Sequence, residues 1–257
     1  MISAKVEAMR PLSIQLYTVR NAIAERGLQP VLADIAAAGY RGVEGGGSDQ
    51  TTAAEFRAMV EDLGMVVSST WGDVATEDGA KALVENCHLL GTTYAAGGFW
   101  IPAFESLEAI EQTAATLNKT LPILKESGIT FGLHNHWMEF ELRDGVLVMD
   151  HLVRLVPDLQ LELDIYWASN FGANKPEEMV SRYRDRTVLL HVKDGPQKQG
   201  EPMTAVGSGT VDVRACIERT DAAWLIVELD EYAGDMMDAV RESSRYLTSE
   251  GLAQGTS

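Results

Sequence analysis

Short apolar runs alternate with longer amphipathic segments eight times along this chain, and this alternation constrains its fold more than any other feature. The expected strands are rich in β-branched and apolar residues, whereas the expected helices carry apolar residues three and four positions apart. The strands are expected at 12–17, 42–44, 65–69, 93–96, 129–134, 160–164, 187–191 and 224–229. The helices are expected at 29–38, 53–63, 79–90, 107–126, 150–156, 176–183, 211–219 and 236–247.

Eight such units in 257 residues average about 32 residues each, near the minimum for a strand and helix of a parallel sheet. Continuous apolar runs such as 188–190 suit strands that are covered on both faces. Because eight strands also close a barrel, we expect a single (β/α)8 TIM-barrel domain over residues 1–257. An open doubly wound sheet is the alternative.

Glycines mark the ends of four expected helices. Gly39, Gly64, Gly91 and Gly128 each follow a helical run and precede a strand, where left-handed backbone favours glycine. No linker or low-complexity stretch interrupts the pattern, and only residues 251–257 are expected to fray.

The composition limits the partners. The chain has 38 acidic and 21 basic residues and a net charge of −17, which disfavours nucleic acid and anionic membranes. No apolar run has the length of about 18 residues that spans a bilayer, and the N-terminus lacks the apolar segment of a secretory signal. Cys87 and Cys216 stand far apart and do not suggest a disulfide framework. We expect a soluble, cytoplasmic protein.

Active sites of such barrels lie at the carboxyl ends of the strands. The last four expected strands end in groups suited to acid–base chemistry or to a divalent cation. These groups are His134 and His136 with Glu139, then Asp164, then His191 with Lys193, and finally Glu228.

The spacing of these groups adds detail. His134 and His136 stand two apart on an extended chain and so face the same way, either for chemistry or to hold loops by hydrogen bonds. Asp164 supplies a carboxylate at short reach, whereas Glu162 lies deeper, where a buried ion pair is at least as expected as a functional role. Lys193 could stabilise an enolate oxygen or hold a substrate hydroxyl.

Other residues near strand ends have competing interpretations. Trp71, Trp100, Trp137 and Trp167 could form an apolar wall for a sugar ring or simply cap the barrel. The glycine-rich segment 205–212 could hold phosphate or be an ordinary turn. Asp230 and Glu231 are expected to begin a solvated loop, and His88 and His151 to be packing or surface residues; these four lie outside the expected site.

These motifs together resemble the sugar phosphate isomerase/epimerase family, whose barrels are similar to xylose isomerase. The combination HNHxxEF, ELDxYW and LHVKD carries the resemblance, and the matching segments extend over nearly the whole chain. They are IQLYTVR (14–20), AAGYRGVE (37–44), LHNHWMEFE (133–141), LELDIYW (161–167), LLHVKDG (189–195), VGSGTVD (206–212) and IVELDE (226–231). Thr70 stands where relatives often carry a histidine.

The resemblance implies one divalent cation, foremost Mn²⁺ and otherwise Mg²⁺ or Co²⁺. Its implied ligands are Glu139, Asp164, His191 and Glu228. In the HNHxxEF branch the first glutamate ligand stands at the position of Glu139, which leaves His134 and His136 for substrate or proton transfer. The implied catalytic residues are His136, Glu139, Lys193 and Glu228, and the implied substrate contacts are His134, Trp71, Trp167 and Glu44.

We therefore expect a metal-dependent isomerase or epimerase that moves a proton next to the carbonyl of a neutral keto-sugar through an enediolate. The alternatives are a metal-dependent lyase or hydratase that eliminates a β-substituent from a 3-keto-glycoside or keto-inositol, or a non-catalytic sugar-binding subunit. A homo-oligomer is possible, and nucleic acid and membranes are not expected partners.

Overall fold

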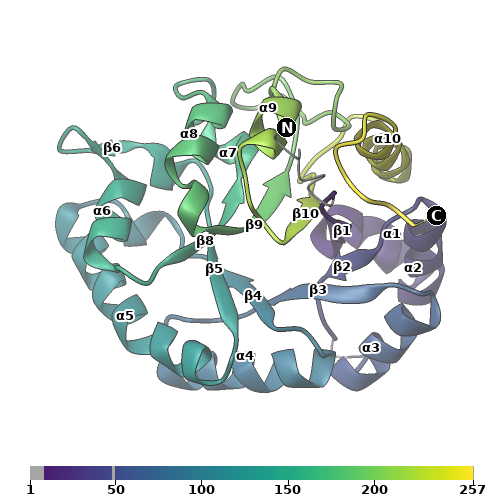
Figure 1. Cartoon of the computed structure of the whole chain (residues 1–257), viewed down its shortest axis with the longest axis horizontal. Coiled ribbons are helices and arrows are strands. Elements are labelled where there is room, and N and C mark those ends of the chain that lie inside the picture. The colour runs from purple at the N-terminus through teal and green to yellow at the C-terminus, as the bar shows by residue number, and fades with distance from the viewer. Residues whose placement is uncertain (1–8, 48–49, 257) are drawn as a thin grey trace, which may run out of the picture.

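The computed structural model describes residues 9–47 and 50–256, and its centre is a closed barrel of eight parallel strands (Figure 1). Around the barrel the strand order is β1-β10-β9-β8-β5-β4-β3-β2. The strands are β1 (Leu12–Gln15), β2 (Gly42–Glu44), β3 (Val66–Trp71), β4 (Tyr94–Gly97), β5 (Thr130–His134), β8 (Gln160–Asp164), β9 (Thr187–Val192) and β10 (Trp224–Val227). The (β/α)8 prediction is confirmed.

Helices surround the barrel, and each of the eight expected ones begins and ends within two residues of its prediction. The helices are α1 (Arg20–Arg26), α2 (Leu28–Ala37), α3 (Ala53–Asp62), α4 (Glu77–Leu90), α5 (Leu107–Glu126), α6 (Val148–Leu155), α7 (Ile165–Ala168), α8 (Pro176–Arg182), α9 (Val213–Glu218) and α10 (Met236–Ser249). We did not predict α1, α7 or the hairpin of β6 (Leu142–Arg143) and β7 (Val146–Leu147). In the described part of the chain, no helix has the length and apolar character to cross a membrane.

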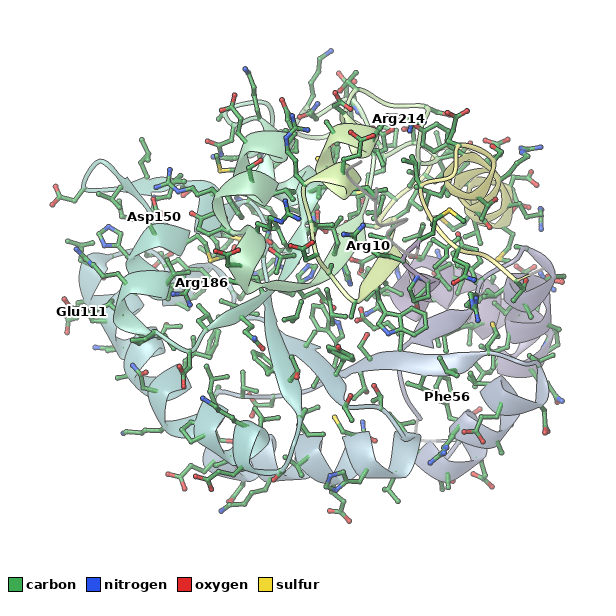
Figure 2. All side chains as sticks on the ribbon, in the orientation of Figure 1. Arg10, Phe56, Glu111, Asp150, Arg186 and Arg214 are labelled. Atoms are coloured by element: carbon green, nitrogen blue, oxygen red, sulfur yellow. The ribbon has the colours of Figure 1, made fainter. Side chains whose placement is uncertain are left out.

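The core lies between the barrel wall and the helices. Phe56 of α3 is fully buried, whereas Glu111 of α5 points to solvent (Figure 2). Because strand side chains alternate in direction, apolar residues such as Leu161 and Leu163 alternate with buried polar ones such as Glu162 and Asp164. The polar set fills the barrel interior near its carboxyl end.

The four glycines predicted at helix ends adopt left-handed backbone conformations, with φ between 72° and 93°. Glycine meets this requirement without the steric cost that a Cβ atom would bring. This prediction is confirmed.

The prediction of a frayed C-terminal tail is wrong for residues 251–256. Leu252 and Ala253 are buried, at 6% and 1% exposed. The Gln254 backbone carbonyl accepts the Leu12 N–H, and the Gln254 N–H donates to the Arg10 carbonyl. The tail therefore pairs with the chain at the start of β1, a contact that hydrophobicity alone did not reveal. Ser257 lies outside the described residues.

Candidate active site

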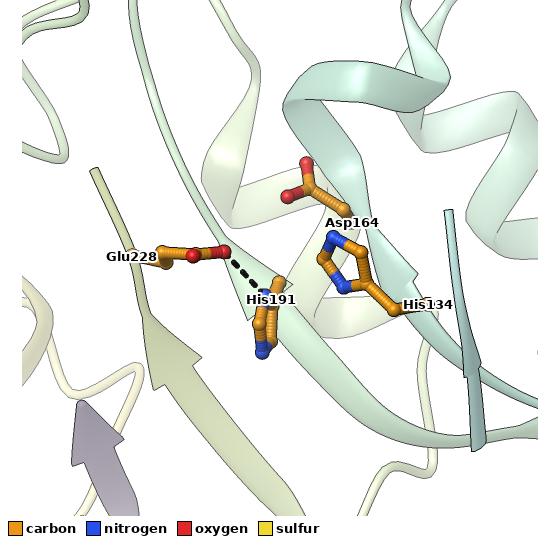
Figure 3. Close-up of side chains that lie close together, drawn as sticks. All are labelled: His134, Asp164, His191 and Glu228. Atoms are coloured by element: carbon orange, nitrogen blue, oxygen red, sulfur yellow. Dashed lines mark hydrogen bonds and ion pairs between the residues drawn. The ribbon is translucent and has the colours of Figure 1, made fainter. Parts of the chain in front are cut away.

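Four buried side chains meet at the carboxyl end of the barrel (Figure 3). His134 ends β5, Asp164 ends β8, His191 lies near the end of β9 and Glu228 directly follows β10. Each offers one potential ligand atom, and these atoms all lie within 4.8 Å of one another. Asp164 and His191 are also register partners across the β8–β9 pair. We call these four residues the upper cluster.

Lys193 adds a buried cation beside the upper cluster. It stands two residues after His191 and is 1% exposed. Its Nζ atom lies 3.1 Å from Asp164 Oδ2, 2.9 Å from Glu228 Oε2 and 2.8 Å from Asp230 Oδ2. Burial opposes the charged form, but these three carboxylates hold the pKa of Lys193 well above its usual value. The expectation that Asp230 only begins a solvated loop is therefore wrong.

Neighbouring charges also determine the protonation state of Glu228. Its Oε2 atom lies 2.8 Å from His191 Nδ1. Although burial alone would raise the pKa of Glu228, Lys193 and His191 hold it well below its usual value. A carboxylate that stays ionised suits a metal ligand better than a general acid.

Glu139 lies on a 3-10 turn, Met138–Phe140, and is fully buried. Its Oε2 accepts the His136 N–H at 3.0 Å, while its Oε1 has no hydrogen-bond partner. Burial, assisted by the charge of Asp164, raises the pKa of Glu139 to about 8. Glu139 is not among the four residues of the upper cluster, in which His134 stands instead. The structure thus brings together three of the four implied metal ligands, with His134 as their neighbour.

His136, the second histidine of the HNH motif, has one ring nitrogen that makes no hydrogen bond. His136 Nδ1 is buried without a hydrogen-bond partner. Burial first, and the charge of Lys193 second, lower the pKa of His136 to about 4, so this ring is neutral at physiological pH. Its ring centre lies 5.0 Å from that of His134 and 4.9 Å from that of Trp100.

Aromatic rings cover this end of the barrel. Trp71 packs on His134 with 4.8 Å between ring centres, and Trp137 and Trp167 lie 5.4 Å apart. Trp100 is 55% exposed and Trp71 is 37% exposed, so part of this aromatic surface faces solvent. The two tryptophans among the four implied substrate contacts, Trp71 and Trp167, are in this group.

A second group of ionisable residues lies against His191 from the opposite side. His191 Nε2 is 2.8 Å from Glu44 Oε1 and 3.2 Å from Glu162 Oε2. Glu162 Oε2 also lies 3.1 Å from His134 Nδ1. We call Glu44 and Glu162 the lower pair. Both are fully buried, and the interpretation of Glu162 as part of a buried ion pair agrees with these contacts.

Sequence reasoning missed Asn135, whose side chain fixes the position of Asp164. Asn135 is fully buried, and its Oδ1 accepts the Asp164 N–H at 2.9 Å while its Nδ2 donates to the Asp164 carbonyl at 3.2 Å. The Asn135 amide therefore continues the β5–β8 pairing for one more residue and fixes Asp164. The only sequence signal is its place between the two histidines.

The glycine-rich segment 205–212 already holds an anion, and that anion is Asp194. Its carboxylate accepts backbone N–H groups from Gly195, Gly207, Gly209 and Val211 at 2.7 to 3.1 Å. A phosphate would need these same donors, so the ordinary-turn interpretation is the one that the contacts favour.

The donor set fits a divalent cation. Five carboxyl groups of the site are buried (Glu44, Glu139, Glu162, Asp164 and Glu228), and Lys193 and His191 are the buried cationic groups beside them. Carboxylate and imidazole ligands together suit Mn²⁺, Mg²⁺ or Co²⁺. Buried oxygens of Glu139 and Glu162 also lack a hydrogen bond. A bound cation would supply the missing positive charge.

Comparisons with known proteins agree with this architecture. Residues 32–250 match the family of xylose isomerase-like TIM barrels. A comparison with curated proteins gives no significant match. A sugar phosphate isomerase/epimerase from Parabacteroides distasonis is similar in structure, with a TM-score of 0.79 at 20% identity over 97% of both chains.

Two further solved structures share the fold. A D-allulose 3-epimerase from Methylomonas sp., in complex with D-allulose, has a TM-score of 0.70 at 15% identity over 94% of this chain and 98% of its own. A probable 3-DHS dehydratase from Bacillus anthracis has a TM-score of 0.68 at 14% identity over 93% and 98%. At such identities the likeness shows the fold alone.

Proposed function

Since the chain belongs to the family of xylose isomerase-like TIM barrels, we propose that it is a metal-dependent isomerase or epimerase of neutral keto-sugars. The observation that carries the proposal is the upper cluster: His134, Asp164, His191 and Glu228, with ligand atoms within 4.8 Å of one another at the active end of the barrel. Mn²⁺ is the expected ion.

Asp164, His191 and Glu228 would hold the cation. The fourth protein ligand would be Glu139 or His134, because Glu139 has a free, buried oxygen and His134 lies in the upper cluster. When bound, the cation would act as a Lewis acid and supply positive charge where the sugar carbonyl oxygen becomes negative.

The chain's own residues would perform the proton transfer. Proton removal next to a carbonyl needs a base beside the carbon, and a second group must return the proton to another position or face. Glu139 and His136 both have a buried polar atom without a partner. The raised pKa of Glu139, about 8, lets this carboxyl group accept and release a proton near neutral pH. Lys193 would add positive charge near the substrate oxygen.

The charges of the site favour a neutral sugar over a sugar phosphate. Lys193 is engaged by three carboxylates. Arg20, also near this end, donates to the backbone carbonyls of Tyr17 and Asp230. Asp194 occupies the backbone N–H groups of the glycine-rich segment. The aromatic rings suit the apolar face of a sugar ring.

The test combines metal analysis with isotope exchange. Keto-sugars are incubated in heavy water with the Mn²⁺-loaded protein, and deuterium incorporation is followed by NMR. We expect deuterium next to the carbonyl with no group lost from the sugar. Elimination of a β-substituent would assign the lyase reaction instead, and no exchange with any sugar would contradict an enzymatic role.

Two variants and one control test the ligands. Asp164→Ala and His191→Ala should lose both bound metal and exchange activity. His88→Ala is the matched control, because His88 lies on α4 away from the site and should leave both unchanged. Full metal occupancy in both site variants would refute the ligand assignment.

A further inference from the structure

The two ring nitrogens of His191 face different groups. Nδ1 lies 2.8 Å from Glu228 Oε2 in the upper cluster, and Nε2 lies 2.8 Å from Glu44 Oε1 in the lower pair. We propose that Glu44 and Glu162 are positioning residues: they hold the Nε2–H of His191, so that Nδ1 is the atom presented to the cation. This inference rests on the proposed cation site and assigns Glu44 a role other than substrate contact.

Glu44 is itself held firmly. Its Oε1 accepts hydrogen bonds from Gln15 Nε2 at 2.8 Å and Trp71 Nε1 at 3.0 Å, and its Oε2 accepts the Ser69 hydroxyl. Gln15 and Ser69 are its register partners on β1 and β3. Since Glu44 is fully buried and every contact goes to protein, a substrate cannot reach its carboxylate without breaking this set.

Glu162 lies beside both histidines and links them. Its Oε2 lies 3.2 Å from His191 Nε2 and 3.1 Å from His134 Nδ1. One oxygen therefore faces both rings, whose centres are 4.6 Å apart. The same contact turns the His134 Nδ1 toward the lower pair and leaves its Nε2 for the upper cluster.

Fixing these rings matters because an imidazole can rotate and can carry its proton on either nitrogen. An acceptor carboxylate on one nitrogen removes both freedoms and makes the other nitrogen a better ligand. Loss of such a partner typically lowers metal affinity or activity about 10–100-fold.

The lower pair could alternatively hold a second cation, since Glu44, Glu162 and His191 also place ligand atoms within 4.8 Å of one another. Besides His191, three hydrogen-bond donors already occupy Glu44, from Gln15, Ser69 and Trp71. A carboxylate has about four lone-pair sites, so few remain for an ion. The hydrogen-bonded arrangement is therefore favoured. It can be distinguished from a second cation site by experiment, because His191 Nε2 carries a proton only in the hydrogen-bonded arrangement.

The first experiment needs no substitution. Protein with ¹⁵N-labelled histidine is loaded with Mg²⁺, and long-range ¹H–¹⁵N correlation spectra identify the protonated nitrogen of His191. A proton on Nε2 supports the proposal. A proton on Nδ1 with Nε2 on the metal, or two bound ions per chain, would overturn it.

The second experiment measures Mn²⁺ affinity by calorimetry. Glu44→Gln keeps the shape but removes the carboxylate, and it should weaken binding about 10–100-fold. Ser13→Ala is the control, because Ser13 is an equally buried barrel residue that bonds Ser68 rather than His191; its affinity should stay close to wild type. Equal affinity in wild type and Glu44→Gln overturns the positioning role, whereas no Mn²⁺ binding by wild type sinks the proposed metal site itself.

Discussion

Lys193→Met should strongly destabilise the metal-free protein. The substitution keeps the length of the side chain but removes an ammonium that lies 2.8 to 3.1 Å from three carboxylates. Asp164 and Glu228 are 0% and 5% exposed, so water cannot replace the lost charge. Breaking a buried ion pair by removing one partner costs about 3–5 kcal/mol, which shifts the unfolding equilibrium by more than about a hundredfold.

The assay is urea unfolding in EDTA, followed by tryptophan fluorescence. Lys125→Met is the matched control: its ion pair with Asp158 has the same 2.8 Å length, but the two side chains are 72% and 71% exposed. Solvent screens such a pair, so its loss should change stability little. Adding Mn²⁺ should reduce the deficit of Lys193→Met, because a cation would compensate Asp164 and Glu228. If both variants lose equally little stability in EDTA, the charge reasoning is refuted.

Three further predictions concern the fold. Leu252→Ala should lower the free energy of unfolding by about 2–5 kcal/mol, measured by urea unfolding, because the tail packs into the core; an unchanged value would mean that the tail is not docked. Gly64→Ala should cost about 1–2 kcal/mol through left-handed strain alone, since φ is 74° and no atom lies within 4 Å of the added Cβ; Gly64→Asn should cost less. Cys87 and Cys216 are fully buried, and burial raises the pKa of Cys87 to about 12. A thiol reagent should therefore label neither in the native protein and both after unfolding; rapid native labelling would contradict this.

Periodicity predicted the barrel because each βα unit is long enough to show its own pattern. The elements that it missed are short or locally specified. Helix α7 has four residues and directly follows its N-cap Asp164, whose side chain accepts the Trp167 N–H. A residue predicted as a metal ligand thus also caps a helix. Helix α7 and the hairpin of β6 and β7 have too few residues to show a period.

The sequence also predicted which strand ends carry the candidate site, but it gave the depth of a side chain in the barrel only for Glu162. Depth depends on strand register, and register shifts occur between Val43 and Glu44 in the β2–β3 pair and between Leu161 and Glu162 in the β8–β9 pair. A shift by one residue changes the direction of a strand side chain. Glu44 and Glu162 stand directly at these shifts. The sequence placed Glu162 deeper than Asp164, but the strand-end argument left Glu44 among the substrate contacts and did not pair it with Glu162.

Asp194 connects the glycine-rich segment to the chemistry of the site. A Cβ at Gly209 would lie 2.1 Å from Asp194 Oδ1, so glycine is required there for the loop to wrap around the carboxylate. Asp194 directly follows Lys193, and its four backbone hydrogen bonds fix the chain where it leaves β9. The loop, for which the sequence left phosphate binding and an ordinary turn open, therefore binds the Asp194 carboxylate and fixes the chain beside Lys193. A phosphate group bound at this loop would have to displace Asp194, whereas a neutral sugar needs none of these donors, and this difference is consistent with the proposal of a neutral sugar.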